Sequence, residues 1–287
     1  MSAAGRGTTA PRVFVLGAGR AGKGLARALV ASGIDVAGLH GRRAEDGAMP
    51  VTAGALPPSL ADAGVVLVAV QDAALEAALA ELLASSRLAP AAVVLHASGS
   101  ADAARGGAAL RAAGHAFGTF HPLVPLSDAE RAPAMLRGAW VGVDGDPRAR
   151  ELSGVLAAAL GARTLEIPAG AKPRYHAAAV FASNFPVVLA AIAARLMADA
   201  GVEAEGARGA VECLLALAAA NVAGHDPAAA LTGPVVRGDA VTVRRHLAAL
   251  AGDDEARAAY VALSRAALGM AALDAAREEA VRRALDD

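Results

Sequence analysis

The sequence predicts an α/β fold: a doubly wound, mainly parallel sheet followed by an all-α C-terminal domain. Two observations support this prediction. Before Pro168, short apolar runs typical of strands alternate with helical segments, which is the pattern of a parallel sheet covered by helices. After Pro168 the strand pattern ends and only helical segments follow. We therefore place a sheet domain at residues 11–168 and an all-helical domain at residues 169–287.

Each strand of the first domain is predicted from a short apolar run. A strand at Val13–Leu16 leads through a glycine-rich turn into a helix at Lys23–Ser32, and a second strand covers Ile34–Leu39. The uncharged run Gly64–Val70 predicts a fully buried parallel strand, and the helix after it has Asp72 as a suitable N-cap. Further strands are expected at Ala92–His96, Ala116–Phe120, Trp140–Val143 and Arg163–Ile167.

The second domain is predicted to be helical throughout. Helices are expected at 174–200, 203–223, 239–251 and 253–285. Pro186 removes a backbone donor inside the first helix, so we expect a kink there. The window 177–194 is long and uncharged enough to suggest a membrane span, but Ser183, Asn184 and Pro186 interrupt it. We expect a buried helix of a soluble domain or dimer instead.

Composition and charge exclude several classes of protein. With 287 residues, of which 55% are hydrophobic, the chain can build a core, unlike a disordered or collagen-like chain. Its 27 basic and 28 acidic residues argue against a nucleic-acid partner. The single cysteine, Cys213, cannot form an intramolecular disulfide or a cysteine zinc cluster. Because the N-terminus lacks an export signal, we expect a cytoplasmic protein with no membrane partner and no metal site.

A glycine-rich turn after the first strand predicts a dinucleotide site in a Rossmann-type domain. The turn opens a helix within an alternating β/α region, which is the context that such a fingerprint requires. Gly17 permits the tight turn, Gly19 lets a pyrophosphate approach the backbone, and Gly22 allows close packing of helix and strand. The phosphates would bind at the helix N-terminus. The predicted cofactor-binding residues of this turn are Gly17, Ala18, Gly19, Arg20, Ala21 and Gly22.

The end of the second strand predicts NADP(H) as the cofactor. An NAD site places a carboxylate about 20 residues beyond the fingerprint, but this strand ends in Leu-His40-Gly-Arg42-Arg43. The two guanidinium groups are suited to a 2′-phosphate, and His40 is expected near the adenine. Val70 and Gln71, at the end of the buried strand, complete the predicted cofactor site.

Polar residues after two further strands are candidates for catalysis. Ligands of this fold bind outside the carboxyl ends of the strands, where Ser98 and His121 are expected. A hydroxyl and an imidazole at this edge can exchange a proton with a carbonyl oxygen. His96 is expected to be structural, and Asp72 to be a helix cap.

The helical domain contains two more clusters. His176 and Asn184 are eight residues apart and therefore share one helix face; together with Tyr175 they are candidates for contacting the substrate or the nicotinamide. In the second cluster, Thr232 supplies a hydroxyl and Arg237 can bind a carboxylate, while a further acidic residue, Asp239, is expected to cap the next helix. His115, His225 and His246 are expected on the surface or in structural roles.

Taken together, these segments resemble a known family. The motifs GAGRAG, VAVQD, HASGS, FHP, YHAAAVFASN and LTGPVVRGD follow one another in this order. This order resembles that of a family classified as oxidoreductases, whose members join a Rossmann-like domain to a C-terminal "domain of unknown function 2520". The resemblance covers roughly Pro11 to Ala271 and extends to pyrroline-5-carboxylate reductase, ketopantoate reductase, 6-phosphogluconate dehydrogenase and prephenate dehydrogenase. It implies NADP(H) binding, hydride transfer to a small molecule between the domains, and a homodimer formed through the helical domain.

The same resemblance suggests residue roles. Ser98 and His121 are similar in placement to the catalytic pair of prephenate dehydrogenase, although the Leu-Val-Pro-Leu-Ser that follows His-Pro here departs from that enzyme. Ketopantoate reductases and β-hydroxyacid dehydrogenases use a lysine near the first helix of the second domain. Lys172 is the only lysine in that region, but it lacks their Lys-x-x-x-Asn spacing. His176 is therefore the preferred proton donor, with Asn184 orienting the substrate.

Three hypotheses for function follow. The leading one is an NADP-dependent reductase of a small 2-oxo acid such as ketopantoate, in which His121 or His176 protonates the carbonyl oxygen. The other contacts would be Ser98 and Asn184 to that oxygen, and Arg237 and Thr232 to the carboxylate. The alternatives are an imine reductase, as for pyrroline carboxylate, and a non-catalytic NADP(H)-binding sensor. No residue specifically indicates a deazaflavin.

Overall fold

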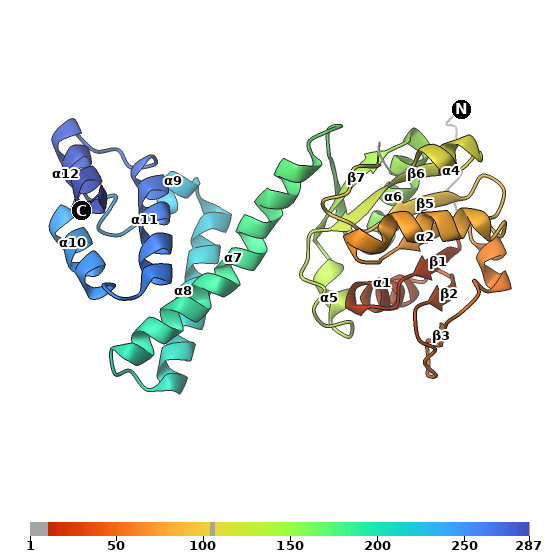
Figure 1. Cartoon of the computed structure of the whole chain (residues 1–287), viewed down its shortest axis with the longest axis horizontal. Coiled ribbons are helices and arrows are strands. Elements are labelled where there is room, and N and C mark those ends of the chain that lie inside the picture. Colours follow the sequence, from red (N-terminus) through yellow and green to blue (C-terminus); the bar gives the residue numbers. More distant parts are fainter. Residues whose placement is uncertain (1–10, 104–106, 287) are drawn as a thin grey trace, which may run out of the picture. The chain divides into compact units, whose positions relative to one another are not determined.

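The computed structural model describes residues 11–103 and 107–286. The N-terminal residues in which no export signal is expected therefore lie largely outside the described part. The chain divides into two compact units, Met1–Asn184 and Phe185–Asp287, and the division falls within one long helix, α7 (Lys172–Asp199). The first unit is built around a β-sheet and the second consists of helices (Figure 1), which confirms the predicted fold class.

The sheet of the first unit has eight strands in the order β3-β2-β1-β4-β5-β6-β7-β8. All neighbours pair in parallel except β6 and β7, which are antiparallel. The strand order reverses between β1 and β4, and ligands of doubly wound folds bind at such a reversal. The strands are β1 (Val13–Leu16), β2 (Val36–His40), β3 (Val51–Thr52), β4 (Val65–Val68), β5 (Val93–His96), β6 (Ala116–Pro122), β7 (Trp140–Gly145) and β8 (Arg163–Glu166).

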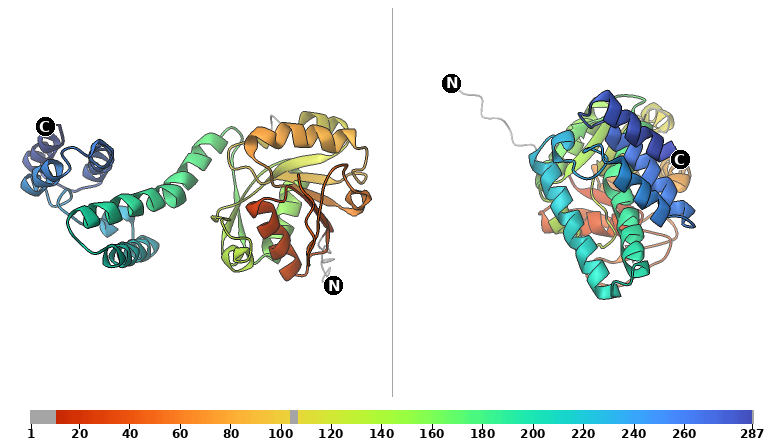
Figure 2. Two further views of the ribbon diagram at one scale, coloured as in Figure 1. Left: turned by 60° about the horizontal axis from the view of Figure 1, so that its bottom comes forward. Right: turned by 90° about the vertical axis from the view of Figure 1, so that its left-hand side faces the viewer.

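Helices cover both faces of this sheet. Alternate residues of the strands point to opposite faces, so β1 contributes Val13 and Val15 to one core cluster and Phe14 and Leu16 to the other. The first cluster is closed by α1, α5 and α6, and the second by η1, α2 and α4; Figure 2 (left) shows the sheet between α1 and α2. These elements are α1 (Arg20–Ala31), the 3-10 helix η1 (Pro58–Asp62), α2 (Asp72–Ala84), α4 (Ala108–Ala112), α5 (Ala132–Leu136) and α6 (Pro147–Ala159).

Two local predictions for the first unit are wrong. Asp72 does not cap α2: the N-cap is Gln71, whose backbone is extended, and Asp72 is the first helical residue. His121 does not follow a strand, because β6 continues through Pro122. The longer strand is stabilised by antiparallel pairing with β7, in which His121 lies opposite Gly142. Sequence periodicity cannot detect this pairing, because the partner strand is distant along the chain.

The second unit contains the rest of α7 and five further helices. These are α8 (Ala204–Gly224), α9 (Pro227–Ala230), α10 (Ala240–Ala249), α11 (Asp254–Leu268) and α12 (Ala275–Asp286). Val243, Leu247, Leu268 and Val281 are buried in a core that α10, α11 and α12 share. The single helix predicted at 253–285 is wrong, because the chain leaves the helical conformation after Leu268 and resumes it at Ala275. The Pro186 position lies inside α7, which continues through it.

α7 and α8 are exposed along most of their length. Both are long and apolar enough to cross a membrane, judged by length and composition alone. In the most apolar window of each helix, none of α7 and 11% of α8 is buried within the chain. Of the two expectations for α7, burial within the domain of one chain is therefore not found in the described residues, and burial in a dimer stays a prediction.

Candidate functional site

A glycine loop joins β1 to the N-terminus of α1. Gly17 has φ +113°, a conformation that favours glycine. A Cβ there would lie 2.6 Å from the carbonyl carbon of Ala69 and 3.1 Å from Cγ1 of Val70. A Cβ on Gly22 would overlap the carbonyl oxygen of Gly17. At Gly19, by contrast, no heavy atom of the described chain lies within 4 Å of the Cβ position.

The N-terminus of α1 is suited to bind an anion. Gly19 is its N-cap, and within the described chain no side chain hydrogen-bonds the N–H groups of the first turn, where there is also no acidic residue. Uncapped N–H groups and the helix dipole both favour a phosphate at this end. The open space at Gly19 therefore fits the pyrophosphate of a dinucleotide.

The end of β2 holds the residues predicted to select the cofactor. Arg42 and Arg43 are exposed. Glu45, the next carboxylate along the chain, forms an ion pair with Lys23 of α1, with Nζ 2.5 Å from Oε2. His40 is buried, and its Nδ1 lies 2.9 Å from Oγ1 of Thr52 in the neighbouring strand. Two guanidinium groups are thus accessible to a phosphate, whereas His40 is engaged within the sheet.

Gly99 marks the point where the two candidate proton donors meet. A Cβ on Gly99 would lie 2.7 Å from Nε2 of His121 and would overlap Nδ1 of His176. The two rings meet edge to face, with centroids 5.7 Å apart. His121 lies near the carboxyl end of β6, His176 lies in the first turns of α7, and Gly99 follows β5. The first unit therefore brings both histidines to the ligand-binding edge of the sheet.

Tyr175 contacts the other ring nitrogen of His121. Its hydroxyl oxygen lies 2.9 Å from Nδ1 of His121, and the two rings are edge to face. The hydroxyl fits only because residue 142 is glycine: a Cβ there would lie 2.7 Å from Cζ of Tyr175 and would overlap the hydroxyl. A glycine inside a strand often marks such a close approach. Tyr175, predicted to bind substrate, thus contacts an imidazole of the site.

A layer of buried polar groups lies around these rings. Lys172 is fully buried, and its Nζ donates a hydrogen bond of 3.0 Å to the carbonyl oxygen of Ser98. His96, also fully buried, has Nε2 3.0 Å from Oγ1 of Thr119. Among the described residues, four side-chain atoms are buried without a hydrogen-bond partner: Nδ1 of His96, His115 and His176, and Oδ1 of Asp144. Such atoms are rare in folded proteins, and all of these except the His115 atom belong to this layer.

Burial and charge keep two of the imidazoles neutral. Burial, followed by the charges of Lys172 and His176, lowers the pKa of His121 to about 4. Burial and Lys172 also lower the pKa of His96 to about 3. Lys172 itself has a pKa lowered to about 8 by burial, which nearby carboxylates including Asp144 oppose. At pH 7 the two histidines are neutral and Lys172 is mostly charged.

These pKa shifts predict a loss of stability in mild acid. Below pH 6.5 the side chains of His96 and His121 bind protons in the unfolded chain. In the folded chain the same side chains stay neutral until the pH falls to 3 to 4. Each histidine therefore lowers the free energy of unfolding by about 1.4 kcal/mol per pH unit once the pH is well below 6.5. Urea unfolding followed by the fluorescence of Trp140, the only tryptophan, measures this between pH 7 and 5. His121→Asn should reduce the slope by the contribution of one histidine; an unchanged slope would contradict the shift.

Ser98 and Asp72 shape the loop after β5. Oγ of Ser98 accepts hydrogen bonds from the N–H groups of Ser100 and Ala101, at 3.2 and 2.9 Å. Asp72 accepts a hydrogen bond from the hydroxyl of Ser100. Burial raises the pKa of Asp72, but hydrogen bonds from Ser100 and Ser98 outweigh it, so the net pKa is lowered. Asp72, which does not cap α2, is therefore an anion whose charge acts on His176.

The second unit presents the other predicted residues on its surface. Thr232 and Arg237 are both exposed on the loop between α9 and α10. Asp239 caps α10 as predicted, accepting hydrogen bonds of 3.0 and 2.7 Å from the N–H and hydroxyl of Thr242. Asn184, at the end of the first unit, is exposed and accepts a hydrogen bond from its neighbour Ser183.

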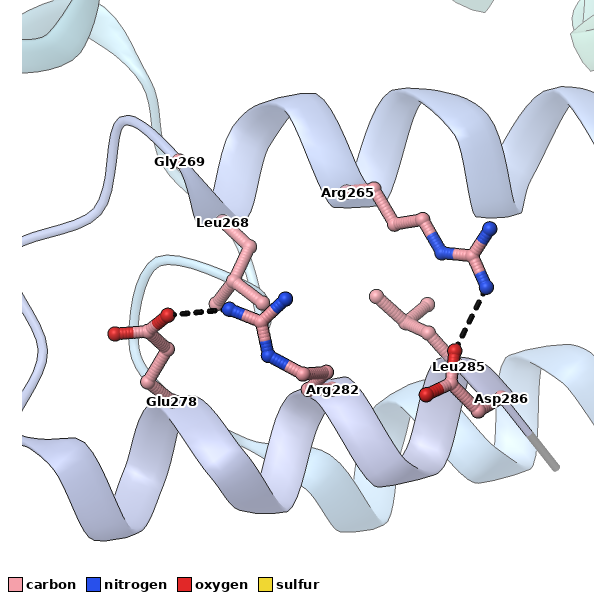
Figure 3. Close-up of a pocket in the computed structure, with 7 residues that line it drawn as sticks. All are labelled: Arg265, Leu268, Gly269, Glu278, Arg282, Leu285 and Asp286. Carbon is pink, nitrogen blue, oxygen red and sulfur yellow. Dashed lines mark hydrogen bonds and ion pairs between the residues drawn. The ribbon is translucent and has the colours of Figure 1, made fainter.

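Two surface hollows of the second unit have charged side chains that pair with one another instead of pointing together at a ligand. The one between α11 and α12 has a volume of about 400 Å³ and is crossed by the ion pairs Arg265–Asp286 and Arg282–Glu278 (Figure 3). Its charges neutralise each other. The second hollow, of about 860 Å³, is lined by α7, α10 and α11 and contains another internal ion pair, Arg195–Asp253. No cluster that could hold a metal ion occurs in the described chain.

Sequence reasoning did not single out the two glycines that make the site possible. Gly99 and Gly142 have no polar side chain, and their importance appears only when a Cβ is placed on them. The available signals were a glycine between two serines and a glycine inside the strand 140–145. The contact of Tyr175 with His121 was likewise hidden, because it joins residues 54 positions apart.

Comparisons with known proteins agree with the fold. Residues 139–267 match the family described as "Domain of unknown function (DUF2520)", and no curated protein matches the chain. A Bacteroides fragilis protein described as a candidate NADP oxidoreductase has a TM-score of 0.70 at 23% identity, over 90% of this chain and 97% of its own. A Thermotoga maritima protein has a TM-score of 0.69 at 24% identity, over 90% of this chain and 98% of its own.

A third similar structure is a pyrroline carboxylate reductase. The Plasmodium falciparum enzyme, with NADP bound, has a TM-score of 0.62 at 11% identity, over 96% of this chain and 97% of its own. Similarity at such identities shows the architecture: a Rossmann-type sheet domain followed by a helical domain.

Proposed function

We propose that this chain, in which residues 139–267 match the DUF2520 family, is an NADP-dependent oxidoreductase that reduces a small 2-oxo acid. The observation that carries the proposal is the convergence of His121 and His176 at Gly99. This point lies at the same edge of the sheet as the open helix terminus at Gly19. A hydrogen-bonding pair at that edge suits a carbonyl oxygen that gains a proton.

The glycine loop and the two arginines support NADP(H) as the cofactor. The first-turn N–H groups of α1 would bind the pyrophosphate, and Arg42 and Arg43 would bind the 2′-phosphate. When bound, the reduced cofactor supplies the hydride. The similar Plasmodium falciparum enzyme binds NADP, which agrees with this assignment.

The residues of the site would hold and protonate the substrate. Nε2 of His121 donates a hydrogen bond to the carbonyl oxygen and passes it a proton. Lys172 fixes the loop after β5 through its bond to the Ser98 carbonyl, and its charge helps to keep His121 neutral. Arg237 and Thr232 stay the predicted partners of the substrate carboxylate.

NADPH oxidation followed by absorbance tests the proposal. Ketopantoate, other short 2-oxo acids and cyclic imines serve as substrates, and NADH serves as the cofactor control. We expect turnover with a 2-oxo acid and a preference for NADPH. Arg237→Ala should raise the KM of the acid at least tenfold, because a charge-assisted hydrogen bond to a carboxylate contributes about 1.5–3 kcal/mol. An unchanged KM would remove Arg237 from the site, and NADPH binding without turnover would favour a sensor.

Imine reduction is the second candidate. It is favoured by the similarity over nearly the whole chain to pyrroline carboxylate reductases and by the lowered pKa of His121. A neutral imidazole is a weak acid, and an imine can be protonated in solution before it binds. Turnover with cyclic imines alone would select this candidate.

We further propose a homodimer, formed through α7 and α8. Val187 of α7 is 70% exposed, and Leu214 and Leu217 of α8 are each 58% exposed. Exposed apolar side chains in such number on two long helices indicate an interface. The helices also carry polar residues, such as Ser183 and Asn221, that a lipid environment disfavours. A dimer of a cytoplasmic protein covers the same surface without that cost.

Sedimentation tests the dimer. The wild-type protein should sediment as a dimer without detergent, and Leu214→Glu/Leu217→Glu should be monomeric because two charges would be buried in the interface. Val241→Glu on α10 replaces another exposed aliphatic residue and should stay dimeric. A monomeric wild type, or a protein recovered only from membranes, would contradict the proposal.

A further inference from the structure

We propose that Tyr175 and His121 form a two-group proton relay, in which the Tyr175 hydroxyl gives its hydrogen to Nδ1 of His121 as Nε2 gives its hydrogen to the substrate oxygen. This inference rests on the proposed carbonyl reduction and names the source of its proton. It also solves a chemical difficulty. A neutral imidazole that simply lost its Nε2 hydrogen would become an imidazolate, which is a poor product at pH 7.

The relay requires that His121 carries its hydrogen on Nε2. Among the described residues, the only hydrogen-bond partner of the Tyr175 hydroxyl is Nδ1 of His121, at 2.9 Å. If Nδ1 donated to the hydroxyl oxygen, the hydroxyl hydrogen would be left without an acceptor among the described residues. The arrangement that satisfies both groups has the hydroxyl donating to Nδ1. The imidazole hydrogen is then on Nε2, the nitrogen that lies against Gly99.

The protonation states of both groups support this direction. Burial raises the pKa of Tyr175 to about 12, so the hydroxyl keeps its hydrogen at pH 7. His121 is neutral and therefore has one nitrogen free to accept. The titratable groups that contact His121 or act on its charge are Tyr175, His176 and Lys172 from α7, Asp72 from α2 and His96 from β5.

The relay balances in atoms and charge. Reduction of the carbonyl leaves an anionic oxygen, which takes the hydrogen of Nε2. Nδ1 takes the hydrogen of the Tyr175 hydroxyl, so the imidazole stays neutral and changes tautomer. The negative charge moves from the substrate oxygen to the phenolate of Tyr175. Tyr175 is only partly buried, so water can return the proton and restore the starting tautomer.

The absence of a side chain at Gly142 leaves the space that the Tyr175 hydroxyl occupies. Gly142 lies opposite His121 in the β6–β7 pair, and any side chain there would displace the Tyr175 hydroxyl. Gly142→Ala should therefore have the same effect on His121 as removal of the hydroxyl in Tyr175→Phe. The two variants change different elements, so agreement between them would not arise from one local folding defect.

The first test reads the tautomer and needs no activity. With ¹⁵N-labelled histidine, NMR couplings show which ring nitrogen of His121 carries the hydrogen, and His121→Asn assigns the signal. We expect the hydrogen on Nε2 in the wild type and a mixture of tautomers in Tyr175→Phe and Gly142→Ala. Tyr260→Phe is the matched control, because the other tyrosine of the chain contacts Nδ1 of His246 at the same 2.9 Å. Hydrogen on Nδ1 in the wild type would overturn the relay.

The second test is the pH profile of kcat. In the wild type we expect kcat to be flat from pH 5.5 to 8.5. Tyr175→Phe should lose about 10- to 100-fold at pH 7 and recover as the pH falls, because its His121 must be an imidazolium to donate a proton. A flat profile with wild-type kcat in Tyr175→Phe would overturn the relay. Absence of turnover in the wild type would instead overturn the proposed function, while the tautomer measurement would still decide the arrangement of the pair.

Discussion

Replacement of His121 by asparagine is expected to lower kcat for a 2-oxo acid about 100- to 10,000-fold, the range that proton transfer by a positioned side chain contributes. Asparagine keeps an N–H donor at this position but cannot exchange a proton. The KM for NADPH should change less than threefold, because the cofactor is assigned to the glycine loop and to Arg42 and Arg43. Steady-state kinetics with each substrate varied in turn measures both effects.

The control for this prediction is the same chemical change at a surface position. His225 follows α8 and is exposed, so His225→Asn should retain wild-type kcat. His176→Asn separates the two candidate donors. Nδ1 of His176 is buried and has no hydrogen-bond partner among the described residues; if His176 does not transfer the proton, the loss should be smaller than for His121→Asn. A loss below about fivefold in His121→Asn would exclude it as the proton donor and support imine reduction.

The sequence predicts elements well where the signal is local. The glycine fingerprint, the buried strand at Val65–Val68 and the cap at Asp239 all depend on neighbours within a few residues. The end of β6 depends on pairing with a distant segment and was predicted wrongly. The break between α11 and α12 was also predicted wrongly, although Gly269 at the end of α11 and Asp274 before α12 mark it locally. The order of the eight strands in the sheet could not be predicted, because the periodicity of one strand does not show which strands lie next to it.

The candidate site shows the same division. His121 and His176 were selected from their residue types and their expected places at the sheet edge, and the structure brings their rings together. The burial of Lys172 could not be predicted, since a lysine beside an exposed proline and arginine is usually on the surface. Its burial changes the interpretation of Lys172. A fully buried ammonium group that donates a hydrogen bond to a backbone carbonyl holds the loop after β5 in place and adds a positive charge near the histidines, and we do not assign it a contact with the substrate.

Replacement of Gly19 by alanine is expected to weaken NADPH binding at least 100-fold without changing the stability of the free protein. The backbone of Gly19, with φ −74° and ψ −176°, is accessible to alanine, and the Cβ position is empty of protein atoms. The methyl group would project into the space assigned to the pyrophosphate and hold it away from the N–H groups of α1. Fluorescence titration with NADPH gives the affinity, and urea unfolding of the free protein gives the stability.

Two other glycines make this prediction specific. Gly22→Ala should lose both binding and stability, because its Cβ would overlap the backbone of Gly17. Gly154 lies in α6, also with an empty Cβ position, so Gly154→Ala should bind NADPH normally and gain about 0.5–1 kcal/mol of stability from helix propensity. If Gly19→Ala bound NADPH as tightly as Gly154→Ala, the pyrophosphate could not lie against the first turn of α1. The assignment of this loop as the cofactor site would then be wrong, even though its backbone has the required shape.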